Sequence, residues 1–290
     1  MKKKVVLFLI GILFLLNIFV WRQVFNLTNN NLKVDFLDVG QGDAIFIETP
    51  QLHQILIDGG PGLAVLEKLQ KFMPFYDRTI DVIILTHPDK DHIEGLLEVL
   101  KRYKIDYILW TGIKRNTFGY QEWIKILDRA EKINKTKIIT DILNKQIKVG
   151  NVFITLLYPL EDLTGNNIKN TSNDTSIVSK LIFGKNTFLF TGDISSKAEK
   201  ELVSKGINLK SDVLKVAHHG SKYSSSNEFL ASVKPNIAVI SVGKNSYGHP
   251  TAETLQRLEN FGIKVLRTDK DDDIEIMSDG NNLLYSVTNF

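Results

Sequence analysis

The sequence predicts an α/β protein in which sheets are covered by helices in layers, preceded by one apolar N-terminal helix. Three observations lead to this prediction. An apolar run occupies 5–21, at the start of the chain. Short strand-like runs separated by turns follow between 32 and 57, and helical and strand patterns alternate from 195 to 267. Early hairpins followed by such alternation are typical of sheets that bury their faces under helices.

The individual elements follow from the spacing of apolar residues, which repeats every two positions in strands and every 3.6 in helices. Strands are expected at 32–39, 44–48, 54–57, 80–85, 151–157, 176–183, 187–190, 212–217, 236–242 and 263–267. Helices are expected around 63–72 and at 92–103, 120–133, 195–205, 227–233 and 252–261. The segments 274–277 and 283–287 form a predicted closing hairpin around Asp279-Gly280, and 160–172 is the longest predicted loop.

The N-terminus has the features of a membrane anchor. Three lysines at 2–4 precede the apolar run, which is near the lower end of the roughly 17–25 residues that a spanning helix needs. The lysines favour a cytoplasmic N-terminus, with the rest of the chain outside the cell membrane. A secreted protein with a cleaved signal peptide is the alternative, although bulky residues at 21–25 offer no small-x-small cleavage site. We expect an anchor at 1–25, a polar linker at 26–31 and one folded domain at 32–290.

Composition excludes several kinds of site. The 290 residues include no cysteine, which excludes disulfides, zinc–thiolate sites and a cysteine nucleophile. The net charge of +3 comes from the anchor, because removing the four basic residues of segment 1–31 leaves 32 basic and 33 acidic residues. The folded part is therefore not a basic protein, and a broad nucleic-acid-binding surface is not implied.

Four apolar strands each run into a polar cluster. The clusters are THPDKDH (86–92), TGD (191–193), HHGS (218–221) and GKNSYGHP (243–250). On its own the first cluster fits a turn, in which Asp91 caps the following helix. Five of the six histidines, however, lie in these four clusters. Ligands of layered α/β proteins bind outside the strand ends, so the pattern favours a metal or catalytic site.

Imidazole and carboxylate ligands together suit zinc, manganese or iron. The clusters offer more ligands than one tetrahedral ion needs, which favours two ions that share a carboxylate, with Asp193 well placed to bridge. Paired ions generate a metal-bound hydroxide near neutral pH, so the natural reactions are hydrolyses of phosphodiesters, esters or amides. Asp91 and His92 are expected to begin a helix, whose dipole keeps the Asp91 carboxylate ionised.

Other residues carry weaker signals. His249 lies in a turn with Lys244 and Tyr247, and is either a turn residue or a group that stabilises an oxyanion or leaving group. Lys215 interrupts a buried strand, so it either extends to solvent or faces the site. Asp38 and Asp58 end strands beside glycines and are either turn residues or partners that orient ligand histidines, with Asp58 favoured as a partner. His53 is predicted to be structural, in a turn without partners.

The clusters belong to a longer series of motifs. The series is FLDVGQGDA (36–44), LIDGG (56–60), THPDKDHIEG (86–95), NDTSIV (173–178), FTGD (190–193), LKVAHHGS (214–221) and NSYGHP (245–250). It resembles the metallo-β-lactamase superfamily, and within it the hydrolase domain of ComEC-type DNA-uptake (competence) proteins. The resemblance implies a four-layer αββα sandwich with a two-metal site between the sheets, and 32–290 as the hydrolase domain. Those proteins also carry a many-helix channel, which this chain with its single apolar segment cannot form.

The resemblance also implies the ligand sets. It places His87 and Asp89 on one ion and Asp91 and His92 on the other, with Asp193 between them. One of His218 and His219 completes the second ion, and His219 is preferred because glycine follows it. With the weaker signals above, the residues expected to be catalytic are Asp91, His249, Lys215 and Asn173, and those expected to be partners of the ligands are Asp58 and Asp174.

Two positions depart from the superfamily signature. Asp89 replaces its second histidine, and Asn173 or Asp174 stands near its third. Both changes occur in the ComEC-like branch, and the oxygen-rich site shifts the expected metal from zinc toward manganese. The expected function is phosphodiester hydrolysis, with single-stranded DNA as a candidate substrate and no protein partner indicated. Phosphocholine esters, lactones and β-lactams are alternative substrates, and a metal-binding interaction domain associated with DNA uptake is the non-enzyme alternative.

Overall fold

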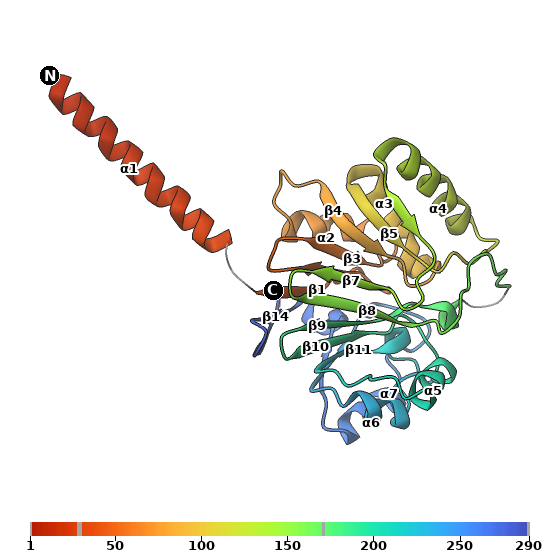
Figure 1. Cartoon of the computed structure of the whole chain (residues 1–290). Coiled ribbons are helices and arrows are strands. Elements are labelled where there is room, and N and C mark those ends of the chain that lie inside the picture. Colours follow the sequence, from red (N-terminus) through yellow and green to blue (C-terminus); the bar gives the residue numbers. More distant parts are fainter. Residues whose placement is uncertain (1, 28–30, 170–171, 289–290) are drawn as a thin grey trace.

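The computed structural model describes residues 2–27, 31–169 and 172–288. Helix α1 (Lys2–Leu27) stands apart from the sheets (Figure 1). Its segment Lys3–Trp21 has a mean hydropathy of 2.5 and no buried residue, so it is long and apolar enough to cross a membrane. A signal sequence has the same length and composition. Residues 28–30 of the predicted linker and 170–171 of the predicted loop lie outside the described residues.

The first sheet has eight strands, in the order β15-β14-β1-β2-β3-β4-β5-β6. Strands β1, β2 and β3 are antiparallel neighbours, and β3 to β6 run parallel to one another. The bounds are β1 (Leu32–Phe36), β2 (Ile45–Glu48), β3 (Gln54–Ile57), β4 (Thr79–Ile84), β5 (Lys104–Leu109), β6 (Lys137–Ile139), β14 (Ile274–Ser278) and β15 (Leu283–Val287).

The second sheet has seven strands, in the order β13-β12-β11-β10-β9-β8-β7. Strands β10 to β13 are parallel neighbours, and β7 to β10 are antiparallel neighbours. The bounds are β7 (Gln146–Val149), β8 (Val152–Tyr158), β9 (Val178–Phe183), β10 (Asn186–Phe190), β11 (Val213–Lys215), β12 (Ile237–Ile240) and β13 (Lys264–Arg267).

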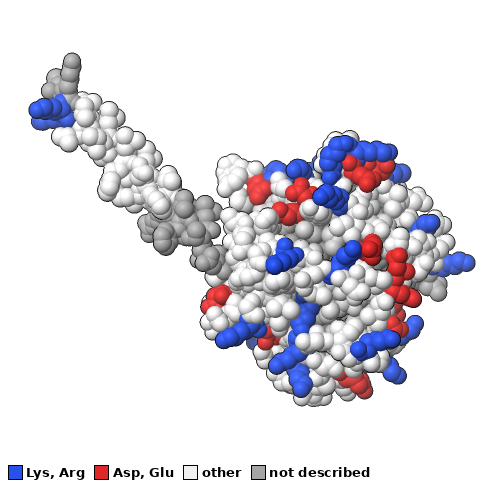
Figure 2. All heavy atoms as spheres, in the orientation of Figure 1, with Lys and Arg blue, Asp and Glu red and all other residues white. Residues whose placement is uncertain are grey.

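Three hydrophobic layers hold these elements together. Alternate strand residues such as Val34, Phe36 and Phe190 fill the space between the sheets. A second layer lies under α2 (Ala64–Phe72), α3 (Lys90–Arg102) and α4 (Phe118–Arg129), and a third lies under α5 (Ser196–Ser204), α6 (Asn227–Val233) and α7 (Ala252–Asn260). The molecule therefore has helix, sheet, sheet and helix layers (Figure 1), which confirms the predicted αββα fold. Figure 2 shows basic and acidic side chains interspersed over the visible face.

The structure corrects several predicted elements. Three strands were not predicted, namely β5, β6 and β7. They are short or carry charges, such as Lys104 and Asp106 in β5, which obscure the two-residue period. The helix expected at 120–133 ends as α4 at Arg129 and continues as a π-helical segment, Ala130–Asn134. A short helix, α8 (Thr268–Asp271), also precedes the closing hairpin.

The carboxyl ends of β4, β10, β11 and β12 lie at one end of the sandwich, because side chains that follow these strands contact one another: His92 and Asp193, Asp193 and His219, and His218 and His249. This is the arrangement that the four polar clusters predicted. The opposite end holds the starts of β1, β3 and β4, since β1 and β3 are both antiparallel to β2.

Candidate metal centre

The segment between β4 and α3 carries four of the predicted ligands. Helix α3 begins at Lys90 with Asp89 in the capping position, so Asp91 lies inside the first turn and the alternative that Asp91 is the cap is wrong. The β1–β2 loop closes against this turn, because the backbone N–H of Asp43 donates to the Asp91 carbonyl at 3.2 Å. Only glycine fits at Gly42, where a Cβ would meet that carbonyl at 2.3 Å.

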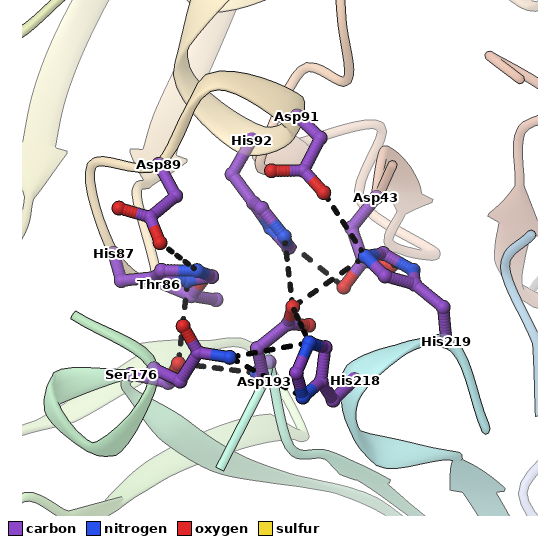
Figure 3. A network of polar contacts seen from close by, with 12 residues as sticks. Asp43, Thr86, His87, Asp89, Asp91, His92, Ser176, Asp193, His218 and His219 are labelled. Atoms are coloured by element: carbon purple, nitrogen blue, oxygen red, sulfur yellow. Dashed lines mark hydrogen bonds and ion pairs between the residues drawn. The ribbon is translucent and has the colours of Figure 1, made fainter. Parts of the chain in front are cut away.

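Four side chains from three segments of the chain converge here: Asp91, His92, Asp193 and His219 (Figure 3). Each offers one ligand atom, and these atoms all lie within 4.8 Å of one another. Asp193 Oδ2 is 3.4 Å from Nε2 of both His92 and His219, and His219 Nε2 is 3.3 Å from Asp91 Oδ2. Two imidazoles and two carboxylates at this spacing are suited to binding a divalent metal ion.

The two histidines are held so that Nε2 faces the centre of the cluster. Nδ1 of His92 lies 2.8 Å from Asp58 Oδ2, and Nδ1 of His219 lies 2.8 Å from the carbonyl oxygen of Ser241. Both Nε2 atoms are buried and have no hydrogen-bond partner among the described residues. Buried nitrogens left unpaired are costly unless something binds them, so the residues fit a metal ion. Asp58 occupies the position expected of a residue that orients a ligand histidine.

The groups predicted for the other ion are less closely gathered. His87 Nε2 is 3.8 Å from Asp89 Oδ2, and His87 Nδ1 lies 3.2 Å from Ser176 Oγ. The other oxygen of Asp89 is 3.2 Å from Nη2 of Arg115 and accepts a hydrogen bond from Ser172. In the described part of the chain, the compact groups of three or more ligand atoms do not include His87 or Asp89.

His218 and His219 occupy different positions although they are adjacent. Both have left-handed backbone conformations, with φ of 50° and 53°, which non-glycine residues adopt mainly where the surroundings enforce them. His219 is buried in the four-residue cluster, whereas the side chain of His218 is 31% exposed and its Nε2 lies 3.9 Å from Asp193 Oδ2. The Nδ2 atom of Asn173 is 3.3 Å from the His218 ring nitrogens. Asp174 instead accepts a hydrogen bond from the backbone N–H of Ser195 at 2.9 Å.

Lys215 lies beneath the cluster and is 1% exposed. It forms an ion pair with Asp43, its Nζ is 3.6 Å from Asp193 Oδ1, and it donates to the carbonyl of Gly192 at 3.1 Å. Lys215 therefore faces the site and does not extend to solvent. Asp43 was not singled out by sequence reasoning, although it lies in the motif FLDVGQGDA and its Oδ1 is 3.4 Å from His219 Nδ1.

Charge in the site is balanced between carboxylates and cationic groups. Burial alone would raise the pKa of Asp193, but His219, His92 and Lys215 outweigh it and hold that pKa well below its usual value. Burial lowers the pKa of His87 well below its usual value, which leaves a neutral imidazole with a lone pair. Asp193 therefore remains an anion and His87 remains neutral, which are the forms that bind metal.

A cleft of about 470 Å³ opens over the cluster. Its lining residues are Gln41, Asp89, Asp91, Asn173, Asp193, His218, His219, Ser221, Lys222, Tyr223, Tyr247, His249 and Thr251. The rings of His249 and His218 lie 5.3 Å apart. Burial, followed by the charges of His218 and His219, lowers the pKa of His249 to about 4, so its imidazole is neutral at pH 7.

Two weaker predictions lie outside the cluster. His53 does have a partner, contrary to the prediction, because its Nδ1 lies 2.8 Å from Asp81 Oδ1. Asp38 accepts a hydrogen bond from the backbone N–H of Gly40 at 3.1 Å, which is a turn contact. Residues without a sequence signal also support the site: Arg115, Ser172 and Ser241. Segments distant in the sequence bring these residues to the site. Their guanidinium, hydroxyl and backbone carbonyl groups are too common in any sequence to mark a site.

Comparisons with known proteins agree with this geometry. Residues 37–244 match the model of the metallo-beta-lactamase superfamily. The chain is 32% identical to ComE operon protein 3 of Bacillus subtilis over 84% of its length and 32% of that protein. It is 32% identical to competence protein ComA of Neisseria gonorrhoeae over 83% of its length and 31% of that protein. It is thus similar to competence proteins of the ComEC type, and it spans about a third of the length of these relatives.

Solved structures share the fold at lower identity. The metallo-beta-lactamase fold protein YhfI of Bacillus subtilis superimposes with a TM-score of 0.55 at 15% identity, covering 83% of this chain and 97% of YhfI. The Zn²⁺-bound PqqB of Methylobacterium extorquens gives a TM-score of 0.53 at 13% identity, covering 84% of this chain and 99% of PqqB. These likenesses support the fold described above.

Proposed function

The chain belongs to the metallo-β-lactamase superfamily, and from this membership we propose that it is a metal-dependent phosphodiesterase, acting on nucleic acid outside the cell membrane. The observation that carries the proposal is the convergence of Nε2 of His92, Nε2 of His219 and Oδ2 of Asp193 on one buried point. A divalent ion bound there supplies a Lewis acid that lowers the pKa of water and stabilises anionic oxygens.

The residues of the chain have distinct roles in this proposal. Asp91, His92, Asp193 and His219 would hold one ion, and His87 and Asp89 would contribute to a second, with zinc or manganese in both. Asp193 lies beside both groups, since its backbone N–H donates to Ser176 Oγ at 3.1 Å and that oxygen lies 3.2 Å from His87 Nδ1. Asp58 orients His92, and Asp174 holds the loop after Asp193 in place.

The remaining site residues act on the substrate or on the ligands. Lys215, which is paired with Asp43, lies behind Asp193, and its positive charge keeps the Asp193 carboxylate ionised. His249 and Asn173 line the cleft on the side of His218, where they can donate hydrogen bonds to a phosphate oxygen or to the leaving group. Asp91 would serve as a ligand and, with an ion bound, would accept a proton from water.

Nucleic acid is the proposed substrate because the relatives are competence proteins and because Lys222, Tyr223 and Tyr247 line the cleft. The two tyrosines are 67% and 73% exposed, and aromatic rings beside a phosphate-binding site suit single-stranded nucleic acid. The proposed location follows from α1, with residues 1–25 as an anchor, the N-terminus in the cytoplasm and the domain at 32–290 outside.

Turnover by the purified full chain tests the proposal. We expect cleavage of bis(p-nitrophenyl) phosphate and of single-stranded DNA only when manganese or zinc is added to chelator-treated protein. His92→Ala removes a ligand and should reduce the rate by at least about a hundredfold, since even loss of the group that orients a ligand costs 10–100-fold.

The matched control is His53→Ala, which removes a histidine that also contacts a carboxylate at 2.8 Å but lies outside the cluster. This variant should retain the activity of the unmodified chain. Equal activity in the presence of chelator would contradict the proposal. Metal-dependent cleavage of phosphocholine esters, lactones or β-lactams in place of phosphodiesters would support the metal centre but contradict the proposed substrate.

A further inference from the structure

The end of the sandwich opposite the metal centre carries strongly exposed aromatic side chains. Phe75 and Tyr76, in the loop between α2 and β4, are 87% and 73% exposed, and their rings meet edge to face at 5.4 Å. Leu52, at the tip of the β2–β3 turn, is 47% exposed. Phe75 is more exposed than any other large apolar side chain in the described part of the chain, which makes this end a candidate contact surface.

The loop presents these rings on a rigid support. The backbone N–H of Asp77 donates to the carbonyl of Pro74 at 2.9 Å and closes a turn around the two aromatic residues. The Asp77 carboxylate accepts hydrogen bonds from Gln54 Nε2 at 2.9 Å and from the backbone N–H of Thr79 at 3.0 Å. The exposed position is therefore built into the fold and is not the result of a loose loop.

This is also the end at which α1 joins the sheets. Lys33, the second residue of β1, lines a hollow of about 500 Å³ together with Leu52, Phe72 and Tyr76. In Figure 2 the surface beside the base of the helix is mostly uncharged. The exposed side chains therefore lie next to the point where the anchor enters the domain.

The connection limits how far this end can move from a membrane. Helix α1 continues six residues beyond Trp21, roughly 9 Å at the helical rise. From Leu27 to Leu32 the chain reaches about 17 Å when fully extended. If α1 spans the bilayer, this end lies within roughly 25 Å of its surface, so the tether permits direct contact.

We propose that Leu52, Phe75 and Tyr76 insert into the interfacial layer of a lipid bilayer and seat the domain on the membrane. Aromatic and aliphatic side chains on a fixed loop gain apolar burial there, and the tyrosine hydroxyl stays among the head groups. This inference rests on α1 acting as an anchor, as in the proposed function. Insertion at this end holds the domain so that the cleft of the metal centre faces away from the bilayer and is open to a polymer in solution.

The absence of cysteine allows a direct test with single labels on the full chain in phosphatidylcholine–phosphatidylglycerol vesicles. The label is an environment-sensitive fluorophore attached to Phe75→Cys. The matched control is Phe118→Cys, which is 78% exposed at the start of α4, after the carboxyl end of β5. We expect a blue-shifted emission, quenched by nitroxide lipids, at position 75 and a water-like, unquenched emission at position 118.

A second labelled pair isolates the contribution of the loop. With the label on Leu52→Cys, the added change Tyr76→Asp should reduce lipid quenching at least twofold. The change replaces a neighbouring side chain that inserts into the bilayer with a charged one that does not. Equal quenching at positions 75 and 118, or a water-like signal at both, would overturn the proposal. Loss of the chain from vesicles in an alkaline carbonate wash would show that α1 does not anchor the chain in the bilayer, and would overturn the proposal because it depends on that anchor. Quenching at 75 in a chain without phosphodiesterase activity would leave this inference standing and reject the proposed reaction.

Discussion

At the scale of single residues, the metal centre depends on how the Nδ1 atoms of its histidines are held. Asp58 holds His92, and the carbonyl oxygen of Ser241 holds His219, so the free Nε2 atoms face Asp193. The sequence predicted the histidines and carboxylates of this cluster, and Asp58 beside them, because these residues follow strands and match a motif. It did not identify Asp43 or Arg115, whose importance arises from contacts between segments distant in the chain.

Asp58→Asn tests this orientation. The amide cannot accept the Nδ1 proton with the same strength, so His92 loses its preferred tautomer and the metal affinity should fall about 10–100-fold. Competition with a fluorescent chelator measures the affinity. Asp81→Asn is the matched control, because Asp81 contacts His53 at the same 2.8 Å distance outside the site, and it should leave the affinity unchanged. A comparable loss in both variants would show that Asp58 has no special role.

At the scale of the elements, sequence periodicity identified most strands and helices because one face of each is buried between layers. It missed β5, β6 and β7, where charged residues or short length mask the period. It also placed the start of α3 two residues late, since the apolar period begins only after the polar ligand segment. Strand β1 has a feature that the period does not explain: Asp35 is 2% exposed and pairs across the strands with Glu275.

Asp35→Asn is expected to stabilise the fold at pH 7. Burial and the nearby Glu275 raise the pKa of Asp35 well above 3.8, so its ionised form is unfavourable in the folded state. A carboxyl group whose pKa is raised in the folded state lowers the stability of the fold at pH values above its unfolded-state pKa. The fold regains this stability as the pH falls and the group becomes protonated. We expect a gain of about 1–3 kcal/mol at pH 7, the cost of an unsatisfied buried group, which vanishes below about pH 3.8.

Urea unfolding at a series of pH values measures this difference. Asp106→Asn is a suitable control, because Asp106 lies on β5 and its side chain is 40% exposed. The control should change stability little at any pH. A lower stability of Asp35→Asn at pH 7 would show that the Asp35 carboxylate makes a favourable contact in the folded state.

At the scale of the whole molecule, the two ends of the sandwich have separate tasks in this account. One end gathers the metal ligands, and the other receives α1 and carries exposed Leu52, Phe75 and Tyr76. The sequence predicted the anchor and the αββα layers. It could not predict that the aromatic loop and the anchor share an end, because this follows from the antiparallel pairing of β1, β2 and β3.

The proposed location predicts protease sensitivity from outside the cell. Spheroplasts of a bacterium that expresses the full chain should lose the folded domain when protease is added externally, while a cytosolic marker protein stays intact. Immunoblotting against the domain follows the loss, and membrane pellets should retain the undigested chain after a carbonate wash. Protection of the domain until the spheroplasts are lysed would place it in the cytoplasm and contradict the proposed location.

Anomalous diffraction from crystals of the full chain grown with manganese, with data collected on both sides of the metal absorption edge, tests the central claim most directly. The account predicts an edge-dependent peak within coordination distance of His92 Nε2, His219 Nε2 and Asp193 Oδ2, with Asp91 turned toward it. A second, weaker peak is expected beside His87 and Asp89. Fully occupied metal elsewhere, with no density among these three atoms, would contradict the account.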